Sequence, residues 1–270
     1  MILDAIQNGF TVDSLIAILL SVPALLLALS AHEAAHGYVA MRCGDPTARM
    51  LGRVTLNPIK HVDAVGFAML FLVGFGWAKP VPVNPRNFKR YRRDDLLVSL
   101  AGITANLIMF AAGCVIMYAW LYWAMGRVPG LLRQLGEGFA VDVGQERYWV
   151  PVDVVLALPT AMDTFLITPF LGKWAGYFYQ MLVYFVIVNL SLAVFNLLPV
   201  PPLDGYHVLN DLILKRNLFA GERAARVGQA ILFALVLTGF LSKGISWVLN
   251  FILDAVGSGA LGLFSGLGLV

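Results

Sequence analysis

Two histidines and a glutamate lie within one turn of an apolar stretch of the chain. They form the sequence His32-Glu33-Ala34-Ala35-His36, an H-E-x-x-H pattern. Side chains four residues apart project from one face of a helix, so His32 and His36 can bind one zinc ion while Glu33 stands beside it. Ionisable groups are costly inside a membrane helix and mark function there. The pattern therefore predicts a zinc site with metallopeptidase chemistry.

A third zinc ligand has to come from elsewhere in the chain, because a catalytic zinc usually takes three protein ligands and leaves the fourth position for water. His61, His207 and a carboxylate are the candidates, and Asp204 is the carboxylate that we favour. Prolines in residues 199–202 end a helix just before it. This places Asp204 on the same side of the membrane as His36, and zinc accepts an oxygen ligand alongside imidazoles. His207 is the local competitor.

The composition indicates a polytopic membrane protein. Of 270 residues, 59% are hydrophobic and 13% are charged, which is too apolar for a water-soluble globule. The net charge of +3 is small and its basic residues gather in a few loops, so they indicate membrane orientation and no nucleic-acid partner. Cys43 and Cys114 show no spacing typical of a disulfide framework or a thiolate metal site.

Four segments are apolar and long enough to be predicted as spanning helices: residues 11–41, 96–125, 174–198 and 230–253. The loop after the first segment and residues 86–93 are both rich in arginine and lysine, so we expect them on the cytoplasmic side. His36 and Asp204 can then meet on the cytoplasmic side, provided that the chain between them crosses the membrane an even number of times. The cytoplasmic loop after the first segment also predicts an exterior amino terminus.

Residues 62–77 are apolar but short, and both flanks are basic, so we predict a re-entrant segment. The proline-rich residues 79–83 after it are expected to be extended, and residues 49–56 are compatible with a short strand. Either stretch could pair with an unwound substrate by strand addition. The connection 126–173 is the longest outside the helices, with an interfacial segment expected at residues 150–167.

Small residues in the second spanning segment, Gly102, Ala105 and Gly113, predict close helix packing. Asn106 in the same segment either bonds to a neighbouring helix or faces the active site, and we favour the first interpretation. The predicted fold is thus an all-α polytopic membrane protein with about four transmembrane helices, a re-entrant segment and short β-strands near the active site.

Two motifs together resemble the site-2 protease family of intramembrane zinc metalloproteases. One is His32-Glu33-x-x-His36, and the other is Asn196-x-x-Pro199-x-Pro201-x-x-Asp204-Gly205, which matches the family's N-x-x-P-x-P-x-x-D-G element at every marked position. The stretches 76–83 and 56–58 also resemble the small bacterial and archaeal members. The resemblance covers residues 16–253. The chain shows no PDZ insertion and no CBS domain, so regulation by such modules is not implied.

The resemblance implies a role for each motif residue. It implies that His32, His36 and Asp204 bind one zinc ion, that Glu33 is the catalytic base, and that Asn196 stabilises the reacting carbonyl of the substrate. It also implies a transmembrane protein substrate in the lipid bilayer and a prokaryotic plasma membrane location, with the active site towards the cytoplasm. We expect a single domain over residues 1–270, with a catalytic core at about 11–210 and a C-terminal helix and tail at 227–270.

Two other classes of protein compete with this interpretation. A membrane zinc protease of another kind would take a glutamate as the third ligand, and no well-placed downstream glutamate is present. A zinc transporter, or a non-catalytic metal-binding membrane protein, would also bind zinc. A transporter is expected to carry ionisable residues in several helices along a path, whereas this chain concentrates them at one depth.

Overall fold

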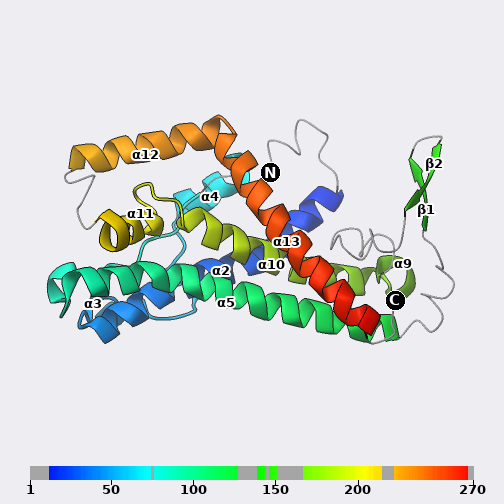
Figure 1. Ribbon diagram of the computed structural model, residues 1–270, viewed down its shortest axis with the longest axis horizontal. Coiled ribbons are helices and arrows are strands. Elements are labelled where there is room, and N and C mark those ends of the chain that lie inside the picture. Colours follow the sequence, from blue (N-terminus) through cyan, green and yellow to red (C-terminus); the bar gives the residue numbers. More distant parts are fainter. Residues whose placement is uncertain are drawn as a thin grey trace.

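The computed structural model describes residues 12–73, 76–126, 139–143, 146–150, 167–214 and 222–266. Most of these residues are helical (Figure 1). In chain order the elements are α2 (Val12–Cys43), α3 (Thr47–Met50), η1 (Pro58–Lys60), α4 (Ala64–Val73), η2 (Pro85–Asn87), α5 (Tyr91–Gly126), β1 (Phe139–Val143), β2 (Glu146–Val150), α9 (Thr168–Leu171), α10 (Lys173–Asn196), α11 (Asp204–Val208), η4 (Leu209–Leu214), α12 (Glu222–Leu237) and α13 (Phe240–Gly266).

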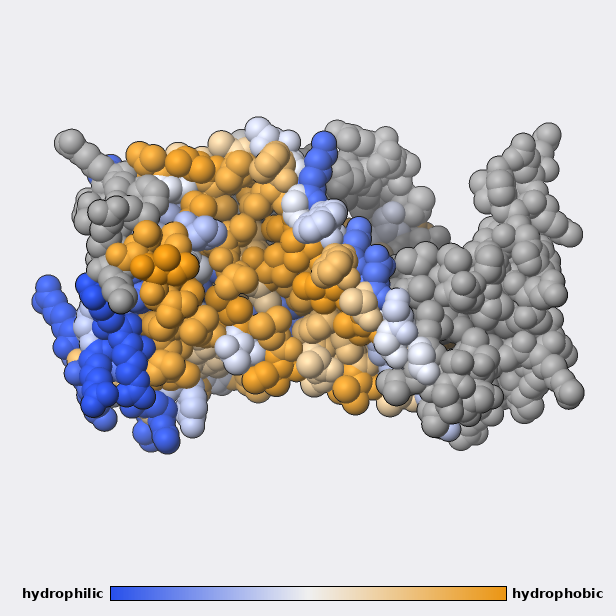
Figure 2. All heavy atoms as spheres, viewed as in Figure 1, coloured by the Kyte–Doolittle hydropathy of each residue, from blue (hydrophilic) through white to orange (hydrophobic). Residues whose placement is uncertain are grey.

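Four of the described helices, α2, α5, α10 and α13, are long and apolar enough to cross a membrane. This confirms the predicted number of spanning helices. The first three correspond closely to the predicted segments 11–41, 96–125 and 174–198. Figure 2 shows hydrophobic residues over the middle of one face, and hydrophilic residues gathered at the end that carries α3 and the start of α5.

The helices α2, α5 and α10 pack against one another and form the core (Figure 1). Small residues allow this close packing: Ala28 and Ala40 of α2 are completely buried. At Gly113 of α5, an added Cβ atom would come within 2.8 Å of the Phe185 ring on α10. The predicted packing role of Gly113 is therefore consistent with the structure, and it brings three helices close enough to share one site.

The C-terminal region contains two helices where the sequence predicted one at residues 230–253. The break lies between α12 and α13, where Gly239 has a φ of 69°. Glycine adopts this left-handed conformation at little cost and commonly ends a helix. On α12, an added Cβ at Gly228 would lie 2.9 Å from Pro201, so α12 packs closely on the loop that leads to Asp204.

The strand predicted at residues 49–56 is wrong, because this stretch begins in the short helix α3 and continues as turns. The Asp45 carboxylate accepts a hydrogen bond from the backbone N–H of Thr47 (3.2 Å), and Pro46 sets a helical φ. The strands β1 and β2 form an antiparallel hairpin. It lies at the opposite end of the molecule from α3, so these strands are not near the candidate site (Figure 1).

The two ends of residues 62–78 are paired with each other. The backbones of Val62 and Ala78 form an antiparallel bridge, and Lys79 donates its N–H to the carbonyl of His61 (2.8 Å). Between these ends lies the apolar helix α4. The two ends of the segment therefore lie side by side. Nearly all of the predicted interfacial segment 150–167 lies outside the described residues.

Candidate active site

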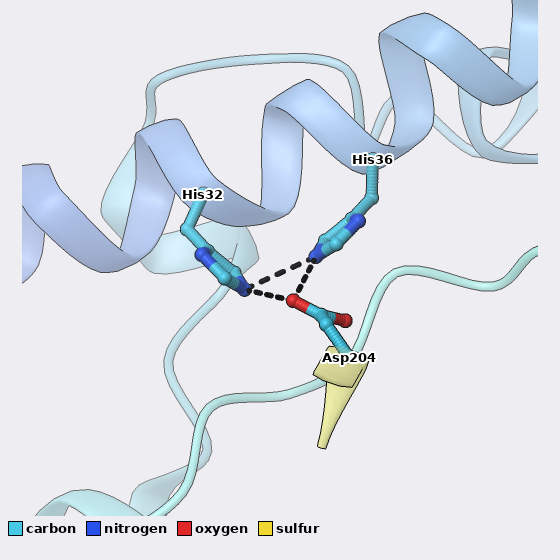
Figure 3. A group of neighbouring side chains, drawn as sticks. All are labelled: His32, His36 and Asp204. Atoms are coloured by element: carbon cyan, nitrogen blue, oxygen red, sulfur yellow. Dashed lines mark hydrogen bonds and ion pairs between the residues drawn. The ribbon is translucent and has the colours of Figure 1, made fainter. Parts of the chain in front are cut away.

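Three potential metal ligands from two distant parts of the chain meet inside the helical core (Figure 3). His32 and His36 lie one turn apart on α2, and their Nε2 atoms are 3.0 Å from each other. Asp204, the first residue of α11, places Oδ2 at 3.3 Å from His32 Nε2 and 3.4 Å from His36 Nε2. Both histidines are buried. The structure thus brings together the three residues that the sequence singled out as ligands.

The hydrogen-bond partners of the two Nδ1 atoms determine whether each Nε2 atom carries a hydrogen or a lone pair. His36 donates Nδ1–H to the backbone carbonyl of Val98 (2.7 Å), which can only accept. His32 donates Nδ1–H to Oδ1 of Asn106 (2.6 Å). Asn106 must present its oxygen there, because its Nδ2 donates to the carbonyl of Ala28 (3.2 Å). In the neutral imidazoles, both Nε2 atoms therefore carry lone pairs directed at each other.

Zinc fits this arrangement of acceptors. Two nitrogen lone pairs and a carboxylate oxygen converge with no hydrogen between them, and Asp204 Oδ2 is buried with no hydrogen-bond donor. Tetrahedral zinc with bonds of about 2.0–2.2 Å holds its ligand atoms roughly 3.3 Å apart, close to the separations found here.

A glycine on α5 makes room for the two histidines. A Cβ atom added at Gly102 would overlap His36 Nε2 and His32 Cε1. The predicted role of Gly102 was general helix packing, but the structure shows that it faces the two imidazoles directly. No spacing rule pointed to this contact, since it depends on how α2 and α5 cross.

A buried chain of amides connects α10 to His32. Asn189 of α10 accepts a hydrogen bond at Oδ1 from Nδ2 of Asn106 (2.9 Å), and Asn106 Oδ1 accepts from His32. Asn106 and Asn189 are both completely buried. Both interpretations of Asn106 are therefore correct, because it bonds to neighbouring helices and also orients a histidine of the site. Such outer partners fix the ring orientation of a metal-binding histidine.

Glu33 lies beside the three potential ligands and is fixed by the proline-rich stretch. Its Oε2 accepts a hydrogen bond from the backbone N–H of Val81 (2.8 Å). The stretch is itself held by the buried Arg53, whose Nη2 donates to the carbonyls of Lys79 (2.7 Å) and Pro80 (3.2 Å). Sequence reasoning did not identify Arg53, because nothing in its spacing relates it to Glu33.

A cavity of about 370 Å³ opens onto these residues and is also lined by Asn196 and His207. Asn196, the last residue of α10, donates Nδ2 to the carbonyl of Leu192 (3.0 Å). The turn that follows requires glycine beside Asp204, because a Cβ at Gly205 would overlap the carbonyl of Leu197. The cavity thus contains a possible base, a possible amide donor and the three potential ligands.

The two other histidines do not join this group. His61 is buried and bonds through Nε2 to the carbonyl of Thr55 (2.8 Å). His207 lines the cavity but donates Nδ1–H to Oδ2 of Asp95 (3.0 Å). Within the described part of the chain, the residues placed to share a metal ion are His32, His36 and Asp204.

Comparison with known proteins relates the chain to one family. Residues 20–239 match Peptidase family M50. The chain is 34% identical over 242 residues to YwhC of Bacillus subtilis (strain 168), which is named as a candidate zinc metalloprotease, and the match covers 89% of each chain. No solved structure matches the chain.

Two more distant relatives carry the same kind of name. Rip2 of Mycobacterium tuberculosis (strain ATCC 25618 / H37Rv) is 27% identical over 235 residues, covering 83% of this chain and 71% of that protein. Rip2 of Mycolicibacterium smegmatis is 24% identical over 223 residues, covering 81% of this chain and 66% of that protein. Both are named as candidate zinc metalloproteases.

Proposed function

Because the chain belongs to peptidase family M50, we propose that it hydrolyses peptide bonds within the transmembrane segments of other membrane proteins. Family membership and the apolar helices already support a membrane zinc metalloprotease. The observation that carries the proposal further is the convergence of His32, His36 and Asp204 beside Glu33 within a bundle of spanning helices. A substrate able to reach that site would itself lie in the membrane.

In this proposal three residues bind zinc and Glu33 acts as the general base. His32, His36 and Asp204 would hold one zinc ion, and a bound zinc would polarise a carbonyl group and lower the pKa of a water molecule to about 7. Glu33 would take a proton from the attacking water and pass it to the nitrogen of the leaving amine. The N–H of Val81 donates a hydrogen bond to Oε2. This bond orients the carboxylate and leaves Oε1 available to accept and transfer the proton.

Asn196 donates a hydrogen bond to the substrate carbonyl oxygen as negative charge develops on it. Its amide carries two N–H groups, and the recorded bond to Leu192 uses one of them. Its position on the wall of the cavity supports this role. Removing one donor of this kind lowers kcat by roughly 10²–10³-fold.

A transmembrane substrate has to unwind locally before it can be cut, because its peptide groups are bonded within its own helix. Residues 79–83 could bind the unwound chain by strand addition, since Val83 N–H and Val81 C=O have no backbone partner among the described residues. The other stretch considered for this role, residues 49–56, is not extended. In this proposal residues 62–77 dip into the membrane and return, which their paired ends at Val62 and Ala78 favour.

The site would face the cytoplasm of a prokaryotic plasma membrane. A cluster of exposed basic residues lies near the end of α2 and the start of α5, and Figure 2 shows this end as hydrophilic. It includes Arg42, Arg49, Arg90, Arg92 and Arg93. His36 lies seven residues before the end of α2, about 10 Å along the helix axis. Basic residues favour the cytoplasmic side.

The test is proteolysis of a reporter transmembrane segment by the purified chain in detergent. Wild-type activity should disappear with a chelator and return with zinc. Glu33→Gln should keep about one zinc per chain while activity falls by several orders of magnitude, and Asp254→Asn, an exposed acid on α13, should remain active.

Loss of zinc from Glu33→Gln would indicate that Glu33 is a zinc ligand and would contradict its assignment as the base. Zinc uptake into vesicles by both the wild type and Glu33→Gln, without cleavage of the reporter, would instead favour a transporter.

A further inference from the structure

A second pair of ionisable residues opens onto the same cavity. His207 on α11 and Asp95 on α5 form an ion pair with Nδ1 and Oδ2 at 3.0 Å. The His207 side chain is 48% exposed and that of Asp95 is 12% exposed. Both residues line the cavity together with Glu33 and Asn196. Neither has a part in the functions assigned so far.

The pair lies on elements that already build the site. On α5, Asp95 is followed at helical spacing by Val98, which binds His36, and by Gly102, which faces both imidazoles. These three residues therefore follow one face of α5. On α11, His207 comes three residues after Asp204, one turn further along. The face of α5 that contacts the two imidazoles therefore also contacts His207, close to Asp204.

The contact with Asp95 determines which ring atom of His207 remains available. His207 donates Nδ1–H to the carboxylate of Asp95, so the bond with Asp95 leaves Nε2 available for another partner. Three acids face His207 from the packed elements: Asp95 on α5, Asp204 on α11 and Asp211 on η4. The hydrogen bond with Asp95 raises the pKa of His207 above 6.5, which favours the imidazolium with a hydrogen on each nitrogen.

We propose that His207, held by Asp95, is a further catalytic residue that donates Nε2–H to the substrate carbonyl oxygen as that oxygen becomes negative. This inference rests on the proposed peptidase function and deepens it. His207 would share the role with Asn196, which approaches the cavity from the end of α10. No bond is made or broken at His207, because it supplies a hydrogen bond to the developing charge.

The test compares His207→Gln with the wild type in cleavage of the reporter segment. The variant should keep the wild-type zinc affinity and KM, while kcat falls by roughly 10²–10³-fold, the range for loss of a donor to an oxyanion. Unchanged kcat would overturn the proposal. Loss of zinc would overturn it too, because His207 would then act as a ligand, and a change in KM alone would make it a binding residue.

The pH profile supplies a readout that a structural role would not change. The donor is the imidazolium, so kcat should fall as pH rises through the pKa of His207. Asp95→Asn removes the carboxylate that raises this pKa, so the fall should move to lower pH. The fall should be absent in His207→Gln, and Asp254→Asn should leave it unchanged. An identical alkaline fall in the wild type, Asp95→Asn and His207→Gln would overturn the proposal.

These outcomes are distinct from failure of the proposed function. If the wild type does not cleave the reporter, or if Glu33→Gln cleaves it as well as the wild type, the peptidase mechanism itself fails. If Glu33→Gln is inactive while His207→Gln retains the wild-type kcat, the mechanism stands and the role of His207 alone is rejected.

Discussion

The backbone N–H of Val81 donates a hydrogen bond to Oε2 of Glu33 over 2.8 Å. These residues come from α2 and from the stretch after α4, so the proposed base is positioned by a segment 48 residues away in the sequence. The same segment is the proposed docking edge for the substrate. Docking and orientation of the base are therefore coupled through one stretch of backbone.

Arg53 should control the reaction through this coupling. Arg53→Met removes the two hydrogen bonds to the carbonyls of Lys79 and Pro80, which frees the segment that positions Glu33. Because a displacement of about 1 Å can cost roughly 10²-fold in rate, we expect kcat to fall by up to that factor. Zinc affinity should be unchanged, since Arg53 does not contact the ligands.

Arg49→Met is the matched control for this prediction. Arg49 lies four residues earlier, is exposed, and contacts Met41 Sδ at 3.5 Å. Kinetics on the reporter substrate and zinc analysis should separate the two variants. Equal kcat in Arg53→Met and Arg49→Met would contradict the positioning role.

Asn106 should contribute to zinc affinity although it touches no metal ion in this proposal. Asn106→Leu removes the acceptor of His32 Nδ1–H, so the ring loses its fixed orientation and tautomer. Loss of such an outer partner typically costs 10–100-fold in metal affinity. Competition with a fluorescent zinc chelator measures the change.

Asn189→Leu provides the comparison for Asn106→Leu. It removes a bond to Asn106 Nδ2 but leaves the contacts of Asn106 with Ala28 and His32. It should lower the stability of the bundle by about 1 kcal/mol, with a smaller effect on zinc affinity. If both variants lost zinc affinity equally, the amide network would act on the site only through overall stability.

Gly102 should tolerate no larger side chain. A Cβ in Gly102→Ala would overlap atoms of both imidazoles, so either α5 must move away from α2 or the rings must turn. We expect loss of zinc binding. Gly244→Ala on α13 is the control, because a Cβ there meets no atom within 4 Å. Normal zinc content in Gly102→Ala, measured by elemental analysis, would show that the helices can separate at little cost.

Local sequence patterns predicted the residues that meet at the site, because the two histidines are fixed by helical spacing and Asp204 by a helix end. The spanning helices α2, α5 and α10 followed from apolar length. The strand predicted at residues 49–56 was wrong, since a helix starts after Asp45 and Pro46 and covers the beginning of this stretch. The break at Gly239 was missed because glycines occur throughout the apolar C-terminal region.

The contacts that could not be predicted all depend on the crossing of distant segments. Gly102 against the imidazoles, Arg53 against the carbonyls of Lys79 and Pro80, and Val81 against Glu33 involve partners 26 to 70 residues apart. Nothing in the local sequence relates them. Asn106 was predicted to bond to another helix or to face the site, and only the packing of α5 between α2 and α10 explains why it does both.

The last prediction concerns membrane topology. His36 and Asp204 meet, so the chain between them must cross the membrane an even number of times. The helices α5 and α10 supply two crossings. If residues 62–77 alone also crossed, Asp204 would emerge on the wrong side. The paired ends of that segment at Val62 and Ala78 agree with a segment that enters and returns.

Single cysteines on either side of α5 test this arrangement in a background in which the buried Cys43 and Cys114 are replaced. Arg86→Cys in η2 lies before α5, and Arg147→Cys in β2 lies after it. An impermeant thiol reagent should label Arg147→Cys in intact cells and Arg86→Cys only after permeabilisation. Each variant should retain zinc, which confirms its fold. Labelling of Arg86→Cys from outside would overturn the re-entrant assignment, and with it the proposal that residues 79–83 bind the unwound substrate on the cytoplasmic side.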